Sequence, residues 1–220
     1  MLRRMGACHN ARVSPSVAPN APTVERLVFF SDAAVAIALT LLILPLMEGV
    51  REAADKGLDA FGYLGENLST LLSFVLSFVI IARFWRSHHR LFSRLELEPP
   101  GLFWLNMCWL LSVVFLPVAT AMTGAMPTDR PQLVVYIGTM LLAALCLTSM
   151  ELVARRHPET WGEGAEVSNE SVVASWAFVL LLAVALLVAV AWPVVGYWSL
   201  LVLAASRPVR VALERLTRRG

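Results

Sequence analysis

Charged residues are scarce in this sequence. They make up 15% of the 220 residues, while 58% are hydrophobic and the mean hydropathy is +0.68. A soluble domain carries about 25% charged residues, so the composition excludes an ordinary soluble protein. It predicts an integral membrane protein.

Cysteines are also few. Cys8, Cys108 and Cys146 are odd in number, and the last two lie inside apolar stretches. Because their spacing matches neither a disulfide framework nor a set of metal ligands, we expect them to be small packing residues.

Catalytic signatures are missing. No G-x-S-x-G or H-E-x-x-H motif occurs. Ser31 adjoins Asp32, but a nucleophilic serine needs a base within hydrogen-bond reach. His88 and His89 are consecutive, so on a helix they point about 100° apart and cannot easily chelate one ion. We expect no enzyme activity, no cofactor, no resident metal and no nucleic-acid partner.

A TVGYG carbonyl filter is missing too. The segment VVGYW, residues 194–198, lacks the threonine and the final glycine, and Pro193 precedes it. No pore helix fits between this segment and the apolar run before it. The segment predicts a hairpin turn with interfacial aromatic residues.

Long apolar runs dominate what is present, and most approach the ~20 residues that cross a bilayer. The uncharged stretch 172–206 is too long for one span, and Pro193 and Gly196 supply a turn within it. We therefore expect an all-α membrane protein with six transmembrane helices. Their predicted ranges are 27–47, 68–85, 102–123, 133–150, 172–190 and 194–206, the last continuing to about Val211.

The basic residues predict the orientation of these helices. Of the 18 Lys and Arg residues, 15 fall in the N-terminal segment, the loops after the second and fourth helices, and the C-terminal segment. The opposite loops hold only Arg51, Lys56 and Arg130. Both termini should therefore be cytoplasmic. We expect a mobile tail over 1–25, a membrane domain over 26–213 and a basic tail over 214–220.

The first predicted helix carries a narrow apolar seam. Its members are spaced 3, 4, 3 and 4 residues apart, which keeps them facing one axis: Phe30, Ala33, Ile37, Thr40 and Leu44. Several copies of this helix around an axis would present apolar rings and one hydroxyl layer, an arrangement that can gate ions. A lipid-facing or helix-packing surface explains the same pattern.

A carboxylate lies on the same helix, away from the seam. Asp32 is about 140° from Ile37 around the helix, so it should face neighbouring helices. Arg26 lies six residues before Asp32 and cannot form an i, i+4 pair with it. The segment ARFWRSHHRLF, residues 82–92, offers polar partners at matching depth. Because a buried charge in a membrane needs such partners, we expect a polar network there.

These residues resemble a known family. Arg26, Phe30, Ser31 and Asp32, followed by AAVAIALTLLILPL, are similar to the R-x-x-x-F-S-D first-helix signature of lysosomal and prokaryotic potassium channels typified by transmembrane protein 175. Weaker agreement runs through 77–89 and 105–122, where Trp85, His88, Asn106 and Pro117 stand at family-like places.

The resemblance implies a homotetramer of six-helix chains that conducts potassium and other monovalent cations through a pore lined by the first helix. By position, Ile37 would be the main constriction, Thr40 the hydroxyl layer and Leu44 a second apolar ring. A structural polar network would contain Arg26, Phe30, Ser31, Asp32, Trp85 and His88. A prokaryotic inner membrane is the expected location.

Three other functions stay open from the residues alone. A proton-coupled transporter would use Asp32 and His88 as its relay. A membrane enzyme would need a nucleophile, a base and an orienting group together, which the sequence does not show. A non-catalytic assembly factor would need no such group of residues.

Overall fold

The computed structural model describes residues 24–162, 164, 168–194, 196 and 199–200. This part of the chain is helical, which confirms the predicted all-α class. The helices are α1 (Val24–Leu41), α2 (Leu44–Asp55), α3 (Ala60–Glu66), α4 (Leu68–Phe92), α5 (Leu102–Ala125), α6 (Arg130–Arg156), the 3-10 turn η1 (Pro158–Thr160) and α7 (Asn169–Ala191).

Five segments of the described chain are long and apolar enough to cross a membrane. They are Val24–Asp55, which contains α1 and α2, and the four long helices α4, α5, α6 and α7. They correspond to the first five predicted spans. The predicted sixth span lies mostly outside the described residues, as do most of the predicted N-terminal tail and all of the C-terminal tail.

The first span differs from the unbroken helix predicted over 27–47. α1 ends at Leu41, two turn residues follow, and α2 begins at Leu44 with Pro45 in its first turn. Proline has no N–H to donate to the carbonyl of Leu41, and its ring collides with that carbonyl. The helix therefore breaks before Pro45, and the Ile43 N–H bonds back to the Thr40 carbonyl at 3.4 Å.

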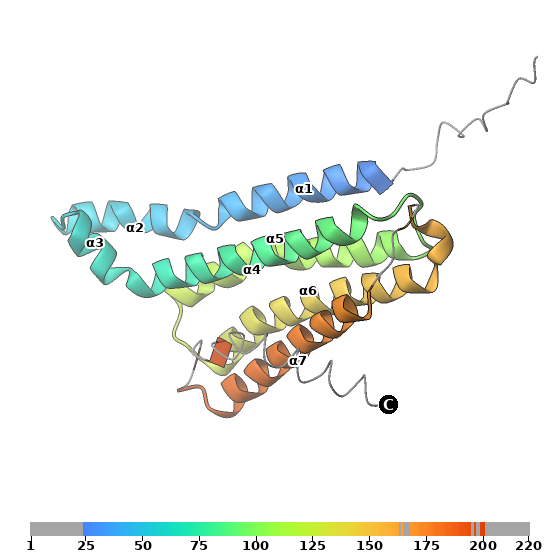
Figure 1. Ribbon diagram of the computed structural model, residues 1–220. Coiled ribbons are helices and arrows are strands. Elements are labelled where there is room, and N and C mark those ends of the chain that lie inside the picture. Colours follow the sequence, from blue (N-terminus) through green and yellow to red (C-terminus); the bar gives the residue numbers. More distant parts are fainter. Residues whose placement is uncertain (1–23, 163, 165–167, 195, 197–198, 201–220) are drawn as a thin grey trace, which may run out of the picture.

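The helices pack as a layered bundle (Figure 1). α1 lies on α4 and α5, α6 packs against α5, and α7 covers the far side of α6. The core is centred on α5 and α6, where Trp109, Leu116, Ile137 and Met140 are fully buried. α1 is therefore an outer element of the single chain, with one side packed and one side bare.

Two polar contacts bind the middle of this bundle. The Ser77 hydroxyl of α4 lies 2.8 Å from the Thr120 hydroxyl of α5 and 2.8 Å from the Tyr136 hydroxyl of α6. Further along, a Cβ on Gly124 would lie 2.7 Å from the Thr70 hydroxyl, so glycine permits the close approach of α4 and α5.

The basic residues gather at one end of the bundle, here called the arginine-rich end. It contains the start of α1, the ends of α4 and α6, and the start of α7 (Figure 1). The loops there are joined, since the Glu96 N–H donates to the Thr160 carbonyl at 2.9 Å and the Gly162 N–H to the Arg94 carbonyl at 3.1 Å. The opposite end carries Arg51, Lys56 and Arg130.

Candidate functional site

The two faces of α1 differ in environment. Leu27, Ser31, Val35 and Ala38 are buried against the bundle. The predicted seam lies on the other side, and Ile37 is 60% exposed in the single chain. Phe30, Ala33, Thr40 and Leu44 are exposed with it. The seam is therefore available to a further element or to a second copy.

The helix break falls inside the seam. Phe30, Ala33, Ile37 and Thr40 lie on α1, whereas Leu44 is the first residue of α2. The Thr40 hydroxyl donates to the Ile37 carbonyl at 2.7 Å. This local bond leaves the hydroxyl oxygen able to accept hydrogen bonds or to contact a cation.

The buried face of α1 is anchored by a chain of hydrogen bonds. The Ser31 hydroxyl donates to the Leu27 carbonyl at 2.8 Å and accepts from the Asn106 Nδ2 of α5 at 2.9 Å. The Asn106 Oδ1 lies 2.7 Å from the His88 Nε2 of α4. Because that oxygen can only accept, His88 donates from Nε2. One amide thus joins α1, α4 and α5.

Aromatic rings enclose the histidine of this chain. The His88 ring stacks between the rings of Phe92 and Trp109, with centroid distances of 4.2 Å on each side. The three polar residues joined by these hydrogen bonds are fully buried: Ser31, His88 and Asn106. The network is therefore a rigid polar contact inside an apolar packing layer.

Asp32 forms a separate contact nearer the surface. The Trp85 Nε1 donates to the Asp32 Oδ1 at 2.8 Å, and the His89 Nδ1 lies 3.9 Å from the Asp32 Oδ2. Trp85 and His89 also stack on each other. As expected on a helix, the two neighbouring histidines diverge: His88 points into the bundle and His89 lies on its surface beside Asp32.

Two predicted members of the network lie elsewhere. Arg26 and Phe30 are both exposed on α1. Within the described residues, no hydrogen bond or ion pair joins either of them to Ser31, Asp32, Trp85 or His88. Phe30 lies on the seam side of the helix. The structure therefore brings together four of the six residues, in two groups.

Residues that the sequence reasoning did not assign complete the site. Asn106 connects Ser31 to His88, Trp109 covers one face of His88, and His89 approaches Asp32. A signal for the first was present, since Asn106 is the one amide side chain in the apolar helix α5. No cluster of three or more His, Cys, Asp or Glu residues suited to a metal occurs in the described part of the chain.

Comparison with known proteins shows a family similarity. The profile described as endosomal/lysosomal potassium channel TMEM175 matches residues 26–117, which contain nearly all of α1 and its contacts on α4 and α5. Over these residues the chain is similar to the TMEM175 family. The signature helix, the anchor and the seam all fall inside the matched segment.

Relatives of the TMEM175 family extend the similarity. A protein of Chamaesiphon minutus named a potassium channel is 32% identical over 134 residues, which cover 58% of this chain and 64% of that protein. The Gallus gallus protein named endosomal/lysosomal proton channel TMEM175 is 27% identical over 169 residues, which cover 74% of this chain and 32% of that protein. This chain therefore spans less than two thirds of the length of either.

A solved structure shares the fold. The crystal structure of a lysosomal potassium-selective channel TMEM175 homolog from Chamaesiphon minutus superposes with a TM-score of 0.62 and 24% identity. The match covers 87% of this chain and 96% of that chain. The predicted multi-pass membrane fold is thereby confirmed, and the predicted resemblance to the family agrees with the profile and the named relatives.

Proposed function

We propose that this protein is a potassium-permeable cation channel in which α1 of four chains lines a central pore. The observation that carries the proposal is the exposed seam of α1, set opposite a face that is fixed to α4 and α5 by buried hydrogen bonds. Similarity to the TMEM175 family profile supports it, as do the names of the potassium-channel relatives. One chain has a single α1, so a pore of this kind requires an oligomer.

The seam supplies the elements of a gate without a carbonyl filter. Rings of Ile37 and Leu44 would form apolar constrictions that exclude water when narrow. Rings of Thr40 would place hydroxyl oxygens between them as one polar layer. Conduction would be passive, with no cofactor.

The anchored face would set the rotation of α1. Ser31 and Asp32 contact different helices, so turning α1 about its axis would break bonds to both Asn106 and Trp85. The polar network thus has a structural role in this proposal and no contact with permeating ions. Arg26 and Phe30 would complete it through a neighbouring chain.

Ion flux from purified protein in liposomes tests the pore assignment. A potassium gradient and an equal sodium gradient are compared for the natural protein, Ile37→Ala and the control Leu187→Ala. Leu187 is an exposed leucine of α7 that lies away from the seam. We expect Ile37→Ala to raise sodium flux relative to potassium flux severalfold. Smaller side chains would widen the constriction, which would then exclude water less well.

The outcomes separate the possibilities. Equal sodium permeability in all three proteins would refute the role of Ile37. A particle of fewer than four chains by light scattering would refute the tetramer. Flux that requires an imposed proton gradient would favour a proton-coupled transporter. Within the described residues no hydrogen bond or ion pair joins Asp32 to His88 directly, since Asp32 bonds to Trp85 and His88 bonds to Asn106.

We also propose that the arginine-rich end faces the cytoplasm of a prokaryotic inner membrane. Arg26, Arg155 and Arg156 lie at this end together with the arginines of α4. An excess of arginine marks cytoplasmic loops. Labelling of a single cysteine placed at Arg156 in intact cells, compared with one at Lys56, tests the assignment.

A further inference from the structure

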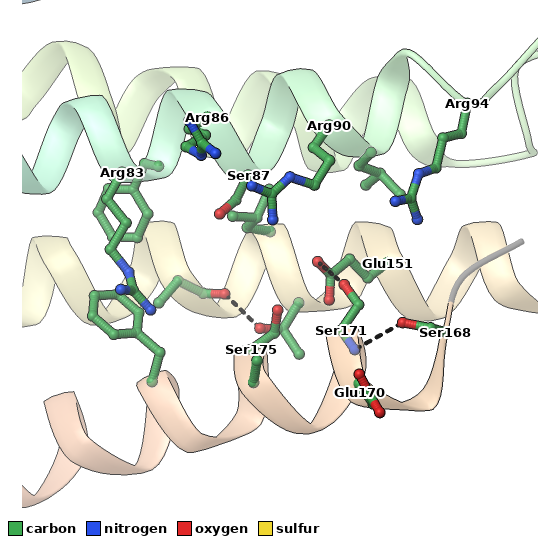
Figure 2. Close-up of a pocket in the computed structure, with 17 residues that line it drawn as sticks. Arg83, Arg86, Ser87, Arg90, Arg94, Glu151, Ser168, Glu170, Ser171 and Ser175 are labelled. Atoms are coloured by element: carbon green, nitrogen blue, oxygen red, sulfur yellow. Dashed lines mark hydrogen bonds between the residues drawn. The ribbon is translucent and has the colours of Figure 1, made fainter. Parts of the chain in front are cut away.

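A cavity of about 420 Å³ opens at the arginine-rich end, between α4 and the start of α7 (Figure 2). α4 forms one wall, the first turns of α7 form the other, and α6 lies behind. The hydrogen-bonded anchor of α1 does not contribute to its lining.

Four arginines line this cavity. Arg83, Arg86 and Arg90 lie on α4, spaced 3 and 4 residues apart, so they follow one face of the helix for about 10 Å. Arg94 follows in the turn after α4. The Arg83 guanidinium lies over the Phe178 ring at 4.2 Å. Arg86 and Arg90 are exposed at the cavity. Their guanidinium groups form no hydrogen bond or ion pair within the described residues, so they are available to a ligand.

The start of α7 supplies hydroxyl groups, and α6 supplies one buried carboxylate. Ser168, Ser171 and Ser175 line the start of α7, where Ser168 caps the helix by accepting from the Ser171 N–H at 3.2 Å. The Ser171 hydroxyl donates to the Glu151 Oε1 at 3.5 Å. Figure 2 shows Arg90 of α4, and Arg94 just after it, extending towards Glu151 and Ser171.

Apolar side chains complete the lining. Phe84, Leu91, Leu147 and Phe178 lie among the polar residues. Arg83, Arg86 and Arg90 lie in the last three turns of α4, a candidate membrane span, where such a helix would leave the hydrocarbon and enter the headgroup layer. Four arginines outnumber the two glutamates of the lining, Glu151 and Glu170, so the cavity has a positive balance.

We propose that this cavity binds a phosphate group, such as the headgroup of an anionic phospholipid. Guanidinium groups match phosphate oxygens in geometry and charge, and serine hydroxyls add neutral donors. The apolar lining suits the first carbons of an attached chain. Glu151 limits the number of negative charges that fit, which selects a single phosphate over a polyphosphate.

The location connects this site to the rest of the bundle. Trp85, His88 and His89 contact α1 or its anchor, while Arg83, Arg86 and Arg90 on the same turns of α4 line the cavity. A bound phosphate would join α4 to α7 on the side opposite the anchor. Binding itself does not depend on the proposed pore.

Lipid binding to the purified full-length protein in detergent tests the proposal. The protein is titrated with phosphatidic acid, and with diacylglycerol of the same chains as a probe without phosphate; bound lipid is counted by native mass spectrometry. R86Q/R90Q removes the two unpaired charges. The matched control R155Q/R156Q removes two exposed arginines at the same end that do not line the cavity.

We expect R86Q/R90Q to bind phosphatidic acid at least about tenfold more weakly, since two charge-assisted hydrogen-bond partners are lost. R155Q/R156Q should stay within about twofold of the natural protein because it leaves the cavity intact. R86K/R90K, which keeps the charge, should bind between the two. If R86Q/R90Q does not purify as a folded protein, R86Q and R90Q alone carry the same test.

Three results would overturn the proposal: unchanged phosphatidic acid binding in R86Q/R90Q, an equal loss in the R155Q/R156Q control, or equal binding of diacylglycerol. Competition with glycerol 3-phosphate identifies the source of the phosphate. Displacement of the lipid by millimolar glycerol 3-phosphate would support the site and assign it to a soluble phosphate. Persistence of the lipid would support the site and assign it to the membrane.

Discussion

The packed and the bare faces of α1 are both apolar, yet in the described residues the hydrogen bonds from α1 to other helices start from the packed side. Ser31 bonds to Asn106 across the helix interface, whereas Thr40 on the bare face bonds only to its own helix. In a bilayer, lipid chains are as apolar as leucine, so apolarity alone does not decide which face packs. Interhelical hydrogen bonds and small side chains decide it.

The largest expected effect comes from filling the packed face. Ala38 is fully buried and adjoins the exposed Ile37. Ala38→Leu should lower the free energy of unfolding by up to ~3 kcal/mol, because added methylenes in a close-packed interface force strain. Denaturation in mixed micelles measures it. Equal effects of Ala38→Leu and Ile37→Leu would contradict the difference between the faces.

Breaking the amide link should have the next largest effect. Asn106→Leu leaves the buried His88 Nε2 without its partner, which costs about 2 kcal/mol of unfolding free energy. Ser112→Ala is the control, since Ser112 is buried in the same helix but bonds only to the Cys108 carbonyl. An Asn106→Leu protein as stable as the control would show that the link does not hold α1.

Removing the surface contact of Asp32 should have a smaller effect. Trp85→Phe deletes the indole N–H that donates to Asp32, and the loss is about 1 kcal/mol because the carboxylate stays partly hydrated. Trp104→Phe, an exposed tryptophan of α5, should change stability less. The same denaturation measurement compares them, and a larger loss for Trp104→Phe would argue against the Asp32 contact.

The smallest effect on stability is expected on the bare face. Thr40→Val removes a hydroxyl that bonds only locally, so the free energy of unfolding should change by no more than ~0.5 kcal/mol. The potassium-to-sodium flux ratio should nevertheless shift, because the proposed pore loses its polar layer. Thr139→Val on α6 is the control. A stability loss without a change in flux would reverse the roles of the two faces.

Much of the fold was predictable because membrane spans are set by length and apolarity. The first five predicted spans each correspond to an apolar segment of the structure. The break before Pro45 was missed, although proline carries a physical reason for it. The direction of Asp32 and the divergence of His88 and His89 followed from the 3.6-residue period. The link through Asn106 did not, because it depends on which helices are neighbours.

Composition and periodicity by themselves determined the membrane class, the spacing of the apolar seam and the end of the bundle that gathers the arginines, since each depends on residues close in the chain. Only the tertiary structure decided that Ser31 bonds to Asn106 and Asp32 to Trp85. It also placed the arginines of α4 opposite the serines of α7. Ser31 and Asn106 are 75 residues apart in the sequence, and Asp32 and Trp85 are 53 residues apart. Lipid would cover the surrounding apolar side chains equally well in other helix arrangements, so local sequence does not select these pairs.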